Sequence, residues 1–134
     1  MFFNKTEQKI EDGKINKMDL GFIDDALGLC IELSHLEIHC SNSYFMTKDK
    51  MWVKLSNEAR IDRSEILDLI TNKDVQGQNW CFGKHDLRSI GYFIELSNRR
   101  NSVGDIEGTI HYLDKASKWL QNFMFVNKYI EEVK

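Results

Sequence analysis

The chain contains no proline among its 134 residues, and proline is the residue that most disrupts a helix interior. Residues that interrupt a helical pattern occur only in three short stretches, 47–49, 73–77 and 101–104. Between these stretches, apolar residues recur every three or four positions, as they do on one face of an α-helix. The sequence therefore predicts four long helices, which span residues 18–46, 48–71, 80–99 and 105–131.

The chain also lacks a run of about 18 apolar residues, which a membrane-spanning helix requires. The N-terminus turns polar directly after Phe3, so we expect no signal peptide. The three cysteines are scattered and never spaced as a CxxC pair. An odd number of scattered cysteines is typical of reduced thiols in a cytoplasmic protein.

The chain also has no excess of basic residues over acidic ones. The net charge is −3, and residues of both signs are interspersed along the chain. Non-specific nucleic-acid binding needs a basic face, so we do not expect it. The glycine-rich phosphate loops of nucleotide-binding proteins are also absent. The remaining function classes are protein binding, ligand binding, and catalysis by polar side chains.

The helix pattern suggests a single domain with a short extension. Residues 1–16 are mostly polar and predict an N-terminal arm or short helix, whereas residues 17–134 predict the helical domain. Short connections force consecutive helices to run antiparallel. We therefore expect an all-α fold, an antiparallel up-down-up-down four-helix bundle. Thr47 and Asn79 have side chains that favour the N-cap position, and they mark the predicted starts of the second and third helices.

Several charged residues occupy positions on predicted apolar faces. The first helix has a stripe of Phe22, Ala26, Leu29, Cys30, Leu33, Leu36, Cys40 and Tyr44. Glu37 lies near the centre of this stripe, where an unpaired carboxylate is costly. Arg63 lies at one edge of the apolar stripe of the second helix, and Asp86 lies inside the apolar arc of the third helix.

Two interpretations of these charged residues stay open. In the first, Arg63 and nearby hydroxyls pair with Glu37 or Asp86 and fix how the helices pack. In the second, the charged residues line an interhelical pocket that binds a small ligand and could support catalysis. The residues predicted to line this pocket are Glu37, Arg63, His85 and Asp86.

The spacing of histidine and cysteine allows a metal site to be considered. His35 and His39 are four residues apart, as are Cys81 and His85, so each pair can present two donors on one helix face. Four such ligands suit tetrahedral zinc. However, the first and third helices are diagonal in an up-down bundle. The simpler interpretation is two solvent-facing histidines on the first helix, a partly packed Cys81 and a half-buried His85.

The last predicted helix carries aromatic residues on several sides. They are Trp119, Phe123, Phe125 and Tyr129. Exposed aromatic side chains are typical of a contact surface, although the N-terminal arm could also cover them. The sequence thus predicts a small helical-bundle binding or interaction module, with a protein partner or a second copy of the chain. The alternative is a ligand- or metal-binding bundle with enzymatic activity at the polar pocket; no cofactor is assigned.

Overall fold

A computed structural model of the chain describes residues 20–131. In this range the chain forms four α-helices and no β-strand, which confirms the predicted all-α class. The helices are α1 (Leu20–Thr47), α2 (Lys50–Ile70), α3 (Gln78–Ser102) and α4 (Ile106–Val126). The predicted arm at residues 1–16 lies outside the described residues.

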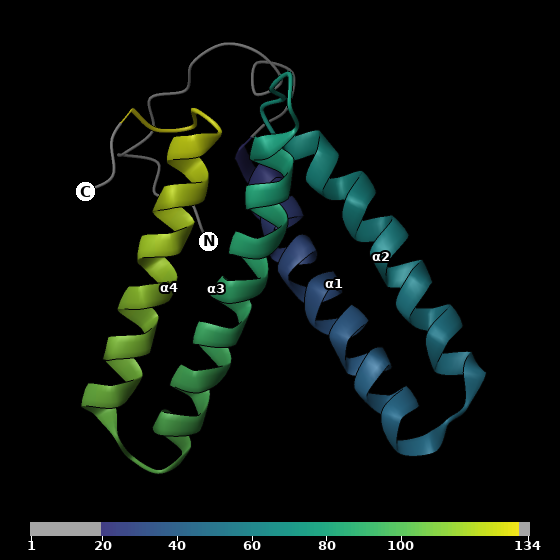
Figure 1. Cartoon of the computed structure of the whole chain (residues 1–134). Helices are drawn as coiled ribbons and strands as arrows, with labels where there is room; N and C mark the ends of the chain where they lie inside the picture. Colours follow the sequence, from purple (N-terminus) through teal and green to yellow (C-terminus); the bar gives the residue numbers. More distant parts are fainter. Residues whose placement is uncertain (1–19, 132–134) are drawn as a thin grey trace.

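The four helices pair as two hairpins. Two residues connect α1 to α2 and three connect α3 to α4, and Figure 1 shows the helices of each pair running in opposite directions. The hairpins contact each other mainly through α1 and α3, whereas α4 has hardly any contact with α1 or α2. Figure 1 also shows the hairpins diverging towards the α1–α2 and α3–α4 turns. The two turns therefore stand apart at the same end of the molecule.

The cap of α2 differs from the prediction. Thr47 is not its N-cap but the last residue of α1. Lys48 leaves that helix with a left-handed backbone, at φ 57°. Asp49 then caps α2, because its carboxylate accepts a hydrogen bond from the backbone N–H of Met51 at 2.9 Å. Threonine and aspartate both favour the N-cap position. Which of the two residues caps α2 therefore depends on where α1 ends.

The start of α3 was also predicted wrongly. Asn79 is not the N-cap, since α3 begins at Gln78 after Gly77, which has a φ of 68°. The carboxylate of Asp74 accepts hydrogen bonds from the backbone N–H groups of Gln78 and Asn79 at 3.1 and 3.0 Å. The side chain of Asn79 donates instead to the carbonyl of Asn72 at 2.6 Å. Capping therefore comes from an aspartate earlier in the turn.

The segment after α4 folds back onto the end of α2. The helix ends earlier than predicted, and Lys128 has a left-handed backbone with a φ of 63°. The side-chain oxygen of Asn127 accepts a hydrogen bond from the backbone N–H of Asn72 at 2.8 Å. The hydroxyl of Tyr129 donates to the carbonyl of Ile70. These bonds attach the C-terminal segment to the α2–α3 turn.

All four helices contribute to the apolar core. Its most buried members are Ile23, Leu27, Cys30, Leu67, Ile70, Leu87, Ile90 and Phe123. The buried face of α1 differs from the predicted stripe, because Ile23 and Leu27 are fully buried while Leu29 and Leu36 are 46% and 48% exposed. Since α1 has apolar residues on most of its sides, periodicity alone does not decide which side packs.

Candidate functional site

Glu37 on α1 is the centre of a charged cluster that joins three helices. Its Oε2 atom accepts hydrogen bonds from Nε of Arg63 on α2 at 3.0 Å and from Nη2 of Arg88 on α3 at 2.7 Å. The side chains of Glu37 and Arg63 are only 14% and 3% exposed. Charge-assisted hydrogen bonds of this kind offset the cost of removing a carboxylate from water. The pairing of Glu37 with Arg63 agrees with the first interpretation of the sequence, in which the charged residues pair and fix how the helices pack.

The cluster contains more positive than negative charge. Two guanidinium groups share one carboxylate, and Arg63 Nη1 and Arg88 Nε are buried without a hydrogen-bond partner among the described residues. An unmade bond of this kind costs about 1–3 kcal/mol. The hydroxyls of Ser41 and Ser56 donate to the backbone carbonyl of Glu37, each at 3.2 Å. Two donors of the cluster are therefore left without an acceptor among the described residues.

The other two residues of the predicted pocket have different environments. Asp86 is buried in α3, and neither of its carboxylate oxygens has a hydrogen-bond partner within the described range. Burial raises the pKa of Asp86 to about 7, because desolvation disfavours the charged form. His85 is exposed rather than half-buried. Within residues 20–131, no hydrogen bond or ion pair links His85 or Asp86 to Glu37.

His35 is not solvent-facing, contrary to the simpler interpretation of the sequence. Its Nε2 atom is buried, and its ring lies against the backbone of Gly91 on α3. The ring also contacts that of Tyr92, with centroids 5.0 Å apart. His35 is therefore part of the contact between the two hairpins.

The remaining candidate metal ligands are accessible to solvent. His39 is exposed and makes an edge contact with the ring of Trp52. Cys81 is exposed rather than partly packed, and His85 is exposed on the same helix. Within the part of the chain that the structure describes, no three His, Cys, Asp or Glu side chains lie close enough to hold a metal ion. The geometry therefore gives the predicted zinc ligands no support.

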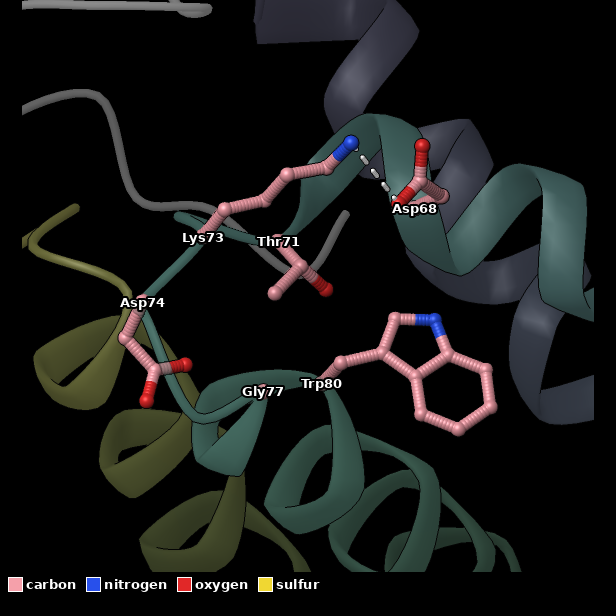
Figure 2. A pocket seen from close by; sticks show the side chains of 6 residues that line it. All are labelled: Asp68, Thr71, Lys73, Asp74, Gly77 and Trp80. Carbon is pink, nitrogen blue, oxygen red and sulfur yellow. Dashed lines mark ion pairs between the residues drawn. The ribbon is translucent and has the colours of Figure 1, made fainter.

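A pocket of about 170 Å³ opens at the α2–α3 turn (Figure 2). Its lining residues are Asp68, Thr71, Lys73, Asp74, Gly77 and Trp80. Figure 2 shows Lys73 extending to Asp68, with which it forms an ion pair at 3.2 Å. Asp74 caps α3, and the ammonium group of Lys84 lies 5.6 Å from the ring centroid of Trp80. These charged groups are already engaged within the chain, and their ion pair and capping bonds stabilise the turn.

Large apolar side chains are exposed at the free ends of both hairpins. We call residues 41–60 tip 1 and residues 96–114 tip 2; they form the two lower ends in Figure 1. Tip 1 exposes Phe45, Met46, Met51 and Val53, and tip 2 exposes Leu96, Val103, Ile106, Ile110 and Leu113. A group of exposed apolar side chains of this kind is typical of an interaction site.

Tip 1 also contains a groove of about 340 Å³ between α1 and α2. It is lined by Ser41, Tyr44, Phe45, Val53, Ser56, Asn57 and Arg60. The volume lies at the lower end of the range of ligand pockets, about 300–1,000 Å³. Most of the lining surface is apolar, and the polar side chains of Ser56, Asn57 and Arg60 lie on the α2 side. The groove therefore suits a segment in which a polar residue stands next to an apolar one.

Sequence reasoning missed two residues of the hairpin contact, Arg88 and Gly91. Arg88 falls on the polar strip of the third predicted helix, yet its long side chain reaches Glu37. A glycine inside a helix costs up to about 1 kcal/mol relative to alanine. Gly91, placed in the middle of an otherwise continuous helix, was therefore a signal that another element approaches closely at that point.

We compared the chain with protein-family models, with curated proteins and with solved structures, and found no match in any of the three. Among the helices of residues 20–131, none combines the length and the apolar character that crossing a membrane requires. The function must therefore be argued from the geometry of the described residues.

Proposed function

We propose that this chain is a protein-interaction module whose contact surface is formed by the two tips. The observation that carries this proposal is the exposure of large apolar side chains at both free ends. Phe45 and Met46 are 66% and 86% exposed in tip 1, and Val103 is 67% exposed in tip 2. Burying such side chains against a partner is favourable by roughly 25 cal/mol per Å² of apolar surface.

The arrangement of the hairpins supports the same proposal. The cores of the hairpins meet where α1 contacts α3, and α4 has hardly any contact with α1 or α2. The apolar residues named in the two tips therefore stay between 42% and 86% exposed. Because aromatic residues and methionine are enriched at protein interfaces, Phe45, Met46 and Met51 fit a contact surface better than a simple solvated face.

Site-specific photo-crosslinking tests the proposal. A benzoylphenylalanine placed at position 45 or position 110 in the full chain is irradiated in the cells that naturally contain the protein. We expect discrete cross-linked protein products from both positions. The matched control is position 65 on α2, where Glu65 is exposed but lies outside both tips. The absence of products from the tips, or an identical pattern from position 65, would show that the tips are not a contact surface.

Binding of a small oxyanion is a second candidate function. It is favoured by the spare donors of Arg63 and Arg88, which share the single carboxylate of Glu37. Phosphate should then raise the melting temperature of the wild-type chain more than it raises that of Arg88→Gln. Arg99→Gln, at an exposed arginine of the same helix, is the control for general salt effects. Equal shifts in all three proteins would rule this site out.

A further inference from the structure

We infer that the partner of the tips is a second copy of this chain, with α4 of one copy lying in the tip 1 groove of the other. This inference rests on the proposed function and adds the identity of the partner. Complementary charge and exposed apolar side chains on the two tips carry it. The groove has a basic rim, and the exposed face of α4 has an acidic border.

The basic rim of the groove follows from the spacing of residues on α2. Val53 and Arg60 both line the groove and are seven residues apart, so they lie on one side of the helix. Lys50, three residues before Val53, is exposed on the same side. Glu58 falls on the opposite half of the helix by the same geometry. The exposed Asp49 caps α2 directly beside Lys50. The groove therefore has an apolar floor and an edge of net positive charge, with two basic side chains and one carboxylate.

The matching surface lies on the first turns of α4. Ile106, Ile110 and Leu113 follow one another at spacings of four and three residues, and they are 58%, 51% and 45% exposed. We call these three residues the α4 stripe. Glu107 and Asp114 directly follow its first and last members and are seven residues apart, so they lie on one side beside the stripe, with the exposed His111 between them. An apolar row with an acidic border complements the basic rim.

A two-fold dimer would make this contact twice. In a closed dimer, if residue i of one copy contacts residue j of the other, then j also contacts i. Each copy has one groove and one α4 stripe, located at the same end of the molecule (Figure 1). A standard-size interface needs about 800 Å² from each partner. The exposed apolar side chains of the two tips, among them Phe45 at 66% and Met46 at 86%, supply apolar surface for such an interface.

The mass of the protein in solution, combined with charge reversal, tests this inference. Multi-angle light scattering at micromolar concentration should give the wild type a mass of two chains of 15.8 kDa each. The groove variant Lys50→Glu/Arg60→Glu and the stripe variant Glu107→Lys/Asp114→Lys should each be monomeric. An equimolar mixture of the two variants should recover the dimer, because every contact then joins opposite charges again.

The outcomes separate this inference from the proposed function. A monomeric wild type would overturn the inference, while the crosslinking experiment would still test the tips as a contact surface for another protein. Dimers that persist in both variants, or variants that stay monomeric when mixed, would overturn the groove-and-stripe contact. Circular dichroism checks folding; if a double variant is unfolded, Arg60→Glu and Asp114→Lys replace the double variants in the same mixing experiment.

Discussion

His35 on α1 lies directly against Gly91 on α3, where the two hairpins are in contact. A β-carbon on residue 91 would overlap the imidazole ring of His35. The Nε2 atom of His35 is enclosed there without a hydrogen-bond partner among residues 20–131. Any side chain at position 91 must therefore displace the ring or push the helices apart.

We expect Gly91→Ala to lower the free energy of unfolding by about 1–3 kcal/mol, the usual cost of overpacking. This is the opposite of the gain that alanine brings to an unconstrained helix position. Urea denaturation measures the change. In the background of His35→Ala, the same Gly91→Ala substitution should cost much less, because the obstructing ring is gone. Equal costs in both backgrounds would contradict the proposed contact.

Removal of the carboxylate at position 37 should be strongly destabilising. Glu37→Ala leaves Arg63 and Arg88 without their shared partner, and we expect a loss of about 3 kcal/mol. The control is Glu32→Ala on the exposed side of α1, which should stay within about 0.5 kcal/mol of the wild type. Chemical denaturation compares the two variants, and a small effect of Glu37→Ala would mean that the cluster does not hold the helices together.

Asp86 should make the stability of the protein depend on pH. Its pKa is raised from an ordinary value of 3.8 to about 7 in the folded chain. Below about pH 4 the carboxyl group is protonated in both states, so it has no effect. Between about pH 4 and 7 only the unfolded state loses the proton, and stability falls by up to about 1.4 kcal/mol per pH unit. Above about pH 7 the loss is complete and constant.

The substitution Asp86→Asn removes the charge and should abolish this dependence. We therefore expect the variant to be more stable than the wild type at pH 8, with a difference that shrinks towards pH 4. Urea denaturation between pH 4 and 8 measures it, and Asp62→Asn, at an exposed aspartate outside both tips, should follow the wild-type curve. If the free energies of unfolding of the variant and the wild type differ by the same amount at every pH, then the pKa of Asp86 is not raised by folding.

The three thiols should react with very different rates. Cys30 and Cys40 are buried, whereas Cys81 is exposed on α3. Burial also raises the pKa of Cys30 to about 12, with a smaller opposing effect from the charge of Arg63, so little thiolate is present at neutral pH. A thiol reagent should modify one group quickly in the native protein and the other two only after unfolding. Rapid modification in a Cys81→Ser variant would contradict the burial of Cys30 and Cys40.

The number and order of the helices could be predicted because they depend on local properties. The absence of proline and the grouping of helix-breaking residues in three short stretches can be read directly from the local sequence. The caps could not be placed, since Thr47, Asp49, Asp74 and Asn79 are all capable of capping. Which of them does so depends on where the preceding helix ends, and that is decided by packing.

The candidate site was predictable only in part. The positions of Glu37 and Arg63 on apolar faces indicated that they needed partners, and they bond to each other. Arg88 could not be added, because helix spacing locates its backbone and not the end of a long side chain. The tips could not be recognised either. A periodic apolar stripe looks the same whether the fold buries it, as it buries Ile23, or leaves it exposed, as it leaves Leu36.

The division into two hairpins has a consequence for the folding rate. Each hairpin joins segments that are neighbours in the sequence, whereas the bond between Arg88 and Glu37 spans 51 positions. Short loops close at a lower entropic cost than long ones, so we expect the hairpins to form early and to dock late. Arg88→Gln should then accelerate unfolding while leaving the refolding rate nearly unchanged in stopped-flow measurements. Because docking comes last, each hairpin would be present by itself for a time before the complete fold forms.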